Sequence, residues 1–343
     1  NFCPIIRRTK IIQNAIDENL SSQTQTIIGK VSNQLIARAA SFLLLADTQA
    51  SFAIEGETPP RNRIERWGKA ISEAGKNDLS IQEIVRLHRI LIEDDRFTSI
   101  GLRKEEVFLG ERDPQNNPMP EFIGAKHTDL EKLMDDFFLF DKKLQDSNVD
   151  PVLHATAVAF GFVYIHPLAD GNGRLHRYLL HHVLAQRGFA PKGIIFPISS
   201  EMHERVEEYS QKLKNHSGPL MDYIEWEPNE KHNVEVRNDT YDLYRFLDCT
   251  EVAEFIFSCV KQTIVKTLPR EIEFLQRHDS TLQRIMNTIE MPDQLARQFI
   301  LFARQNDGKL GKKRRKNEFA DLTDEEVKDL EEIFKDEFEG FTL

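Results

Sequence analysis

The sequence predicts a mostly α-helical protein that carries one short β-hairpin. Apolar residues recur at three- and four-residue steps through residues 31–54, as they do on one face of a helix. One segment, residues 107–124, combines two short apolar runs with a dense cluster of turn-forming residues, which favours a β-hairpin or an extended flap. Helix N-cap signals are spread along the rest of the chain, at Ser80, Thr128, Asp150 and Thr323.

The composition limits the class of protein. The chain has 343 residues, a net charge of -11 and 40% hydrophobic residues, and its mean hydropathy is -0.47. Its apolar runs are too short to span a membrane, and its first residues lack the apolar core of a secretory signal. The three cysteines have neither metal-ligand spacing nor even pairing, so we expect reduced thiols and a cytoplasmic protein.

The elements follow in order along the chain. A helix is predicted over residues 31–54, and further helices begin at the caps Ser80 and Thr128. Asp150 and Pro151 open a helix that stops near His166 and Pro167, and a new helix begins within residues 171–173 and ends at Gly188. Residues 270–340 are predicted to form more helices. We expect an N-terminal helical region over residues 1–78, a catalytic core over 79–218 and a C-terminal helical extension over 219–343.

The charge is unevenly placed. Residues 318–343 hold most of the negative charge, and a basic segment, Lys309–Lys316, comes immediately before them. Such a basic segment beside an acidic helix is most often used in ion pairs. Contact with nucleic acid is the alternative interpretation.

The most informative stretch is residues 166–177, His-Pro-Leu-Ala-Asp-Gly-Asn-Gly-Arg-Leu-His-Arg, in the loop between two predicted helices. The start of the second helix presents free N–H groups that attract anions. Gly171 and Gly173 have no Cβ atoms, so a phosphate can approach the backbone. Arg174 and Arg177 lie on one face of that helix. The pattern therefore predicts a site for a di- or triphosphate.

Two further side chains add chemistry to this loop. Asp170 supplies the carboxylate with which Mg²⁺ is usually held beside phosphate oxygens. His166 can accept a proton near neutral pH. Each residue by itself could serve a plain helix–turn–helix corner, but folding alone does not require this combination. The chain lacks a P-loop, a dinucleotide-binding glycine turn, a zinc-binding His-Glu-x-x-His and a Gly-x-Ser-x-Gly elbow.

This stretch resembles the signature of the Fic (filamentation induced by cAMP) family, His-x-Phe-x-Asp/Glu-Gly-Asn-Gly-Arg-x-x-Arg. Leu168 is the one departure, because the family usually has Phe there. The resemblance implies a mostly helical fold and transfer of AMP from ATP to a hydroxyl of a target protein. It implies these roles by position: His166 as the general base, Asp170 as the Mg²⁺ ligand, and phosphate binding by Gly171, Asn172, Gly173, Arg174 and Arg177.

Two other segments are similar to features of the same family. The predicted hairpin matches the flap that aligns the target by strand-like pairing, through Val107, Phe108, Leu109, Gly110, Phe122 and Ile123. Residues 51–56, Ser-Phe-Ala-Ile-Glu-Gly, fit the inhibitory motif Ser/Thr-x-x-x-Glu-Gly/Asn, with Ser51, Glu55 and Gly56 at its fixed positions. The resemblance implies that Glu55 pairs with Arg174 and so misplaces ATP.

The favoured interpretation is an autoinhibited, Mg²⁺-dependent protein adenylyltransferase that uses ATP and a target Ser, Thr or Tyr hydroxyl. One alternative on the same fold is an enzyme that removes AMP, with Glu55 orienting the water. An alternative from another class is a nucleotide-sensing or DNA-binding regulator that uses the basic segment Lys309–Lys316. Tyr209, on a predicted helix at 201–214, is a candidate for stacking on the nucleotide base.

Overall fold

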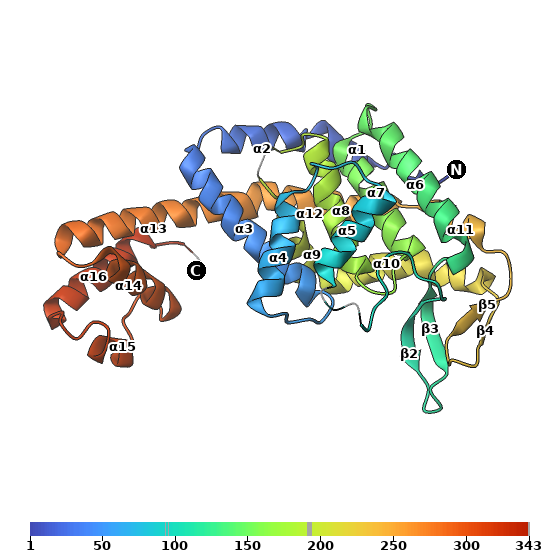
Figure 1. Cartoon of the computed structure of the whole chain (residues 1–343). Coiled ribbons are helices and arrows are strands. Elements are labelled where there is room, and N and C mark those ends of the chain that lie inside the picture. Colours follow the sequence, from blue (N-terminus) through green and yellow to red (C-terminus); the bar gives the residue numbers. More distant parts are fainter. Residues whose placement is uncertain (93, 95, 191–193, 342–343) are drawn as a thin grey trace. The chain divides into compact units, whose positions relative to one another are not determined.

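The computed structural model describes residues 1–92, 94, 96–190 and 194–341 (Figure 1). The fold is mostly helical, as predicted. Its N-terminal half contains α1 (Lys10–Asp17), α2 (Leu20–Ile28), α3 (Asn33–Ala53), α4 (Arg61–Ser72), α5 (Ile81–Leu91), α6 (Leu130–Gln145), α7 (Pro151–Ile165) and α8 (Asn172–Gln186). The remaining longer helices are α9 (Ile198–Glu204), α10 (Val206–Leu220), α12 (Thr250–Gln262), α13 (Leu268–Thr288), α14 (Asp293–Gln305) and α16 (Asp324–Glu337). None of the described helices is both long and apolar enough to cross a membrane.

The helices α7 and α8 form the centre of the part of the chain that carries the predicted site. Residues 154–165 of α7 are all buried, and its sequence is apolar on every side, which is typical of a helix surrounded by others. Asp150 caps α7 by accepting from the Val152 N–H at 2.8 Å, with Pro151 at the first helical position, as predicted. The loop between α7 and α8 therefore starts and ends on rigid, buried helices.

Among the described residues, three pairs of short strands accompany the helices. The predicted hairpin is confirmed as β2 (Phe108–Arg112) and β3 (Pro118–Ile123), which pair antiparallel with an irregularity between Leu109 and Gly110. A second hairpin, β4 (Trp226–Pro228) and β5 (Val234–Val236), lies beside the first (Figure 1). A parallel pair joins β1 (Cys3–Ile5) to β6 (Phe246–Asp248). The second hairpin and the parallel pair were not predicted.

The N-cap predictions differ in outcome. Ser80 and Thr323 accept hydrogen bonds from residues three positions on, and Thr323 and Glu326 form a complete capping box. The predicted start at Thr128 is wrong, because Thr128 lies inside a 3₁₀ turn (His127–Asp129) and α6 begins at Leu130. Residues 124–126 join β3 to this turn, so the chain makes one tight turn before α6 begins.

By its internal contacts, the chain divides into two compact units. The first comprises residues 1–32 and 40–267, and the second comprises residues 33–39 and 268–343. The second unit has its own core, which includes Phe299, Phe319 and Phe334. The short helix α15 (Lys312–Lys316) carries the basic segment, and two of its arginines are used in ion pairs, Arg314 with Glu318 and Arg315 with Asp324. The three-part division at residues 78 and 218 stays a prediction.

Candidate active site

The loop from residue 166 to residue 171 is held at Leu168 by the side chain of Asn172. His166 ends α7 in the left-handed conformation, with φ 54° and ψ 57°, and Gly171 begins α8 with φ 86°. The Asn172 side chain accepts from the Leu168 N–H at 3.0 Å and donates to the Leu168 carbonyl at 2.9 Å. Leu168 itself is fully buried and pairs with Leu102. The side-chain amide of Asn172 thus closes the loop. Leu168, at the position where the family signature usually has Phe, anchors the loop in the core.

The His166 side chain is poised to accept a proton. Its Nδ1 lies 3.1 Å from the Val163 carbonyl, so Nδ1 carries the hydrogen and Nε2 is the free acceptor of the neutral ring. Burial lowers the pKa of His166 to about 4, against the opposing effect of the Val163 carbonyl. The ring of Phe122, on the flap strand β3, lies 5.6 Å from the His166 ring between centroids. The candidate base therefore faces the flap and is neutral at pH 7.

The end of α3 brings Ser51 and Glu55 to Arg177. The Arg177 Nε donates to the Ser51 hydroxyl at 3.0 Å, and its Nη2 donates to the Ser51 carbonyl and to Glu55 Oε1, both at 2.7 Å. The expected pair between Glu55 and Arg174 is wrong, because Glu55 pairs with Arg177 instead. Arg177 points toward the end of α3, and this orientation cannot be read from its position along α8.

Arg174 is held by a different carboxylate, Glu57, which the sequence analysis did not single out. The Arg174 Nη1 lies 2.7 Å from Glu57 Oε1, and its Nη2 donates to Asp170 Oδ1 at 2.9 Å. Arg63 on α4 reaches Glu57 from the other side at 3.1 Å. Glu55 and Glu57 lie in one turn whose backbone N–H groups both donate to the Phe52 carbonyl. One turn after α3 therefore supplies a carboxylate to each of the two arginines.

Glu55 also lies against the start of α8. A Cβ atom at Gly173 would come within 2.1 Å of Glu55 Oε1, so only glycine allows this carboxylate to lie so close to the first turn. Gly56, which lies between Glu55 and Glu57, has φ 71°, a conformation that favours glycine. The place where an anion would bind to the helix N-terminus is thus occupied by a carboxylate of the chain itself.

Asp170 is suited to hold a cation at the edge of the site. Its side chain is 51% exposed, and Oδ1 accepts from the Gly171 N–H at 2.6 Å and from Arg174. No group of three or more potential metal-ligating side chains occurs within the described residues. A single carboxylate that faces solvent fits Mg²⁺, which usually combines one or two carboxylates with phosphate oxygens and water.

A cavity of about 180 Å³ opens beside His166, between the flap and α10. Leu109 and Phe122 of the flap, Tyr164 of α7 and Leu213 of α10 line it. Of the other predicted flap residues, Ile123 is buried. Val107 lies at the stem of the flap, and Gly110 lies at the irregularity in the pairing of its two strands. Tyr209 does not line this cavity: it is buried and stacked between His176 and Phe255. A base bound in this cavity would therefore not stack on Tyr209.

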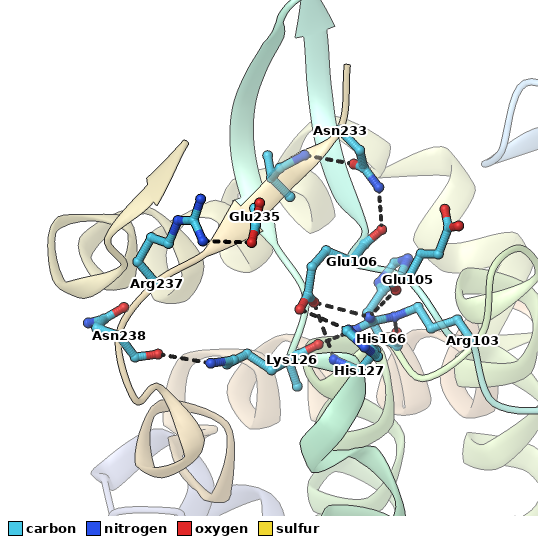
Figure 2. A network of polar contacts seen from close by, with 12 residues as sticks. Arg103, Glu105, Glu106, Lys126, His127, His166, Asn233, Glu235, Arg237 and Asn238 are labelled. Atoms are coloured by element: carbon cyan, nitrogen blue, oxygen red, sulfur yellow. Dashed lines mark hydrogen bonds and ion pairs between the residues drawn. The ribbon is translucent and has the colours of Figure 1, made fainter. Parts of the chain in front are cut away.

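A buried arginine that precedes the flap also contacts the site. The Arg103 Nε donates to the His166 carbonyl at 2.8 Å, and its guanidinium faces Glu106, which also contacts His127 (Figure 2). The sequence offered little signal for Arg103 or Glu106, because they lie in a charged stretch, Arg-Lys-Glu-Glu, that resembles an ordinary surface segment. Only their burial distinguishes them from other charged residues.

The fold and the loop geometry define a helical protein that carries a phosphate-binding type of loop between two buried helices, with a β-hairpin beside it. Residues 78–184, about a third of the chain, match the model of the Fic/DOC family, so this part of the chain is a Fic/DOC family domain. A crystal structure of a Fic family protein from Desulfovibrio desulfuricans aligns with a TM-score of 0.55 and 18% identity, covering 82% of this chain and 81% of that chain. This likeness confirms the predicted fold.

Curated proteins are similar over part of the chain. The protein adenylyltransferase fic-1 of Caenorhabditis elegans is 26% identical over 151 residues, which is 44% of this chain and 27% of that protein. The protein adenylyltransferase Fic of Nematostella vectensis is 29% identical over 147 residues, 43% of this chain and 31% of that protein. The Drosophila melanogaster protein of the same name is 32% identical over 123 residues, 36% and 23% of the respective chains. The alignments thus span about a third or less of each relative.

Proposed function

We propose that this protein is a protein adenylyltransferase that transfers AMP from ATP to a hydroxyl side chain of a target protein. The observation that supports it most directly is a neutral His166 with a free Nε2, placed at the loop that leads into Arg174 and Arg177. The names of the curated relatives agree with this activity. The three thiols, none of them in a disulfide, suit the reducing cytoplasm that we propose as its location.

In the proposed reaction, His166 Nε2 accepts the proton of the target hydroxyl as its oxygen attacks the α-phosphorus of ATP. The bond between the α-phosphorus and the bridging oxygen breaks, and pyrophosphate leaves. Arg174 and Arg177 would bind the β- and γ-phosphates, and Gly171 and Gly173 would let the α-phosphate approach the backbone. Mg²⁺, held by Asp170, would supply neutralising charge on the phosphates.

The structure suggests a narrower role for Asn172 than phosphate binding. Both polar atoms of its side chain are bonded to the Leu168 backbone. We therefore assign Asn172 to holding the loop closed, so that the backbone N–H groups at the start of α8 face one point. Preorganised donors of this kind stabilise developing charge without reorganisation during the reaction.

The cavity beside His166 is the proposed place for the nucleoside. Its lining is mostly aliphatic and aromatic, with Leu109, Phe122 and Leu213 around it. Such a lining suits a flat base. The outer part of the flap, where Leu109 and Met119 are exposed, would then dock the target's extended segment.

We propose further that the described state is autoinhibited. Glu55 and Glu57 hold the two arginines that the triphosphate needs, and Glu55 lies against the first turn of α8. A carboxylate 4 Å from a phosphate charge repels it by about 4 kcal/mol at an effective dielectric constant of 20. ATP would bind productively only after these carboxylates move away.

Mass spectrometry of the intact protein tests the transfer. The Glu55→Gly variant is incubated with Mg²⁺ and, separately, with each of the four nucleoside triphosphates. We expect self-modification that adds one or more adenylyl groups with ATP, and no modification when His166→Ala is added. The proposed activity is wrong if, with ATP, neither the Glu55→Gly variant nor a candidate target protein added to it gains mass. It is also wrong if the added group is not AMP.

A further inference from the structure

We propose that Arg103 is the positioning residue that sets His166 at a fixed distance from the flap. The candidate base and the docking element belong to different parts of the chain, since His166 ends α7 and the flap is a separate hairpin. The transfer reaction needs a fixed distance between His166 and the flap. The target hydroxyl must reach His166 Nε2 while the backbone of the target pairs with the flap. Arg103 contacts the backbone of His166 and of the residues that flank the two flap strands.

The contacts of Arg103 reach three segments at once. Its Nε donates to the His166 carbonyl at 2.8 Å, and its backbone N–H donates to the Pro167 carbonyl at 3.0 Å. Its Nη1 donates to the Glu105 carbonyl at 2.7 Å, before β2, and its Nη2 donates to the Ala125 carbonyl, after β3. One guanidinium therefore joins the corner that carries the base to both stems of the flap.

The corner that Arg103 holds is under strain. His166 is a non-glycine residue in the left-handed region, and such residues persist only where their surroundings over-determine them. A Cβ atom at Gly124 would lie 3.0 Å from the Arg103 Nη2 and 3.1 Å from the His166 Cβ, so the three residues are packed without spare room. Gly124 therefore lets the guanidinium and His166 pack closely against the end of the flap.

The charge of Arg103 is balanced by Glu106 at the flap stem. Arg103 is 4% exposed, and its Nη1 lies 3.5 Å from Glu106 Oε2. Glu106 also accepts from the His127 backbone N–H at 3.2 Å, and its carbonyl accepts from Asn233 at 2.8 Å (Figure 2). Lys231 pairs with Glu105 at 2.6 Å on the same side. The turn of the second hairpin thus supports the stem that Arg103 holds.

Arg103 also acts on the His166 ring through its charge. The guanidinium lowers the pKa of His166, whereas Glu55 and Asp170 raise it. Removing the Arg103 charge is therefore expected to raise the pKa of His166, while a lysine in its place would keep the charge and lose the fork of donors. These two substitutions separate the electrostatic effect of Arg103 from its geometric effect.

The test uses the full chain with Arg103→Lys and Arg103→Gln. The kinetic part of the test rests on the proposed function, so each substitution is made in the Glu55→Gly background, in which we expect transfer activity. Arg103→Lys is expected to lower kcat by about 100-fold, the size of effect that a displacement of about 1 Å produces. Its KM for ATP should stay within about twofold, because none of the proposed ATP ligands is changed. Arg187→Lys is the matched control, since Arg187 also donates to three backbone carbonyls, those of Leu144, Ser147 and Val149.

A second readout does not depend on activity. In the wild-type protein, nuclear Overhauser contacts are expected between the rings of His166 and Phe122, whose centroids are 5.6 Å apart. They should weaken in Arg103→Lys and persist in Arg187→Lys. Titration of the His166 ring by NMR, without Mg²⁺, should show a higher pKa in Arg103→Gln than in Arg103→Lys. A protein with no transferase activity would overturn the proposed function but would leave this readout able to decide the role of Arg103.

The proposal is overturned if Arg103→Lys keeps both the ring contacts and kcat, or if Arg187→Lys lowers kcat equally. Should Arg103→Lys fail to fold, Glu106→Gln provides the same readouts, because it removes the carboxylate that faces the Arg103 guanidinium and so loosens its hold on the carbonyls. We then expect weaker ring contacts and a smaller loss of kcat. Unchanged ring contacts in Glu106→Gln would count against the proposal.

Discussion

The paired carboxylates Glu55 and Glu57 make a quantitative prediction for ATP affinity. Glu55 is 35% exposed and lies 2.7 Å from a fully buried Arg177, and Glu57 is 31% exposed and lies 2.7 Å from Arg174. A hydrogen bond to a charged group contributes about 1.5–3 kcal/mol, and partial exposure places each contact near the lower value. Because about 1.4 kcal/mol is a factor of ten, Glu55→Gly should tighten ATP binding about tenfold.

Glu57→Gln should act on the other arginine and tighten ATP binding less, by a few-fold, because Asp170 continues to hold Arg174. The double variant should exceed either single variant. Isothermal titration calorimetry with a non-hydrolysable ATP analogue measures this, in a His166→Ala background that prevents self-modification. Glu65→Gln is a suitable control, because Glu65 is exposed and pairs with the exposed Arg61 on α4. If Glu57→Gln binds the analogue as the control does while Glu55→Gly binds more tightly, the second carboxylate has no inhibitory role.

Two further predictions concern the base and the loop. Burial lowers the pKa of His166 to about 4 from its ordinary value near 6.5, so the neutral, proton-accepting form persists as the pH falls through 6.5. The kcat of the Glu55→Gly variant at saturating ATP and Mg²⁺ should therefore stay level down to about pH 5.5 and fall as the pH approaches 4; a loss of half the rate near pH 6.5 would contradict this. Leu168→Ala, at a fully buried position, should lower the free energy of unfolding by about 2–5 kcal/mol, measured by urea denaturation; a loss below about 1 kcal/mol would show that the loop repacks without the side chain.

Local signals predicted most of the elements that build the site. Asp150 and Pro151 indicated where α7 begins, and Gly171 and Gly188 indicated the ends of α8, because each effect acts within one helical turn. The flap was predictable because its turn residues separate two apolar runs. The second hairpin escaped prediction, since its strands have only three residues each and depend on contacts with the flap stem.

The partners of the two arginines could not be predicted in the same way. Positions 174 and 177 are three residues apart, which places both on one face of a helix but does not say which one faces the end of α3. Glu55 was therefore expected on Arg174, whereas the structure places it on Arg177 and places Glu57 on Arg174. Arg103 escaped prediction for a related reason, because charged residues are usually exposed and its burial depends on carbonyls that are distant in the sequence.

The sequence by itself therefore determined the helical class, the loop of residues 166–177 and the kinds of side chain available for its chemistry. These features depend on backbone preferences and spacing, which act over a few residues. Only the tertiary structure decided that one turn after α3 holds both arginines and that Arg103 joins His166 to the flap. Those contacts join residues up to 126 positions apart, and their geometry is set by how the buried helices pack.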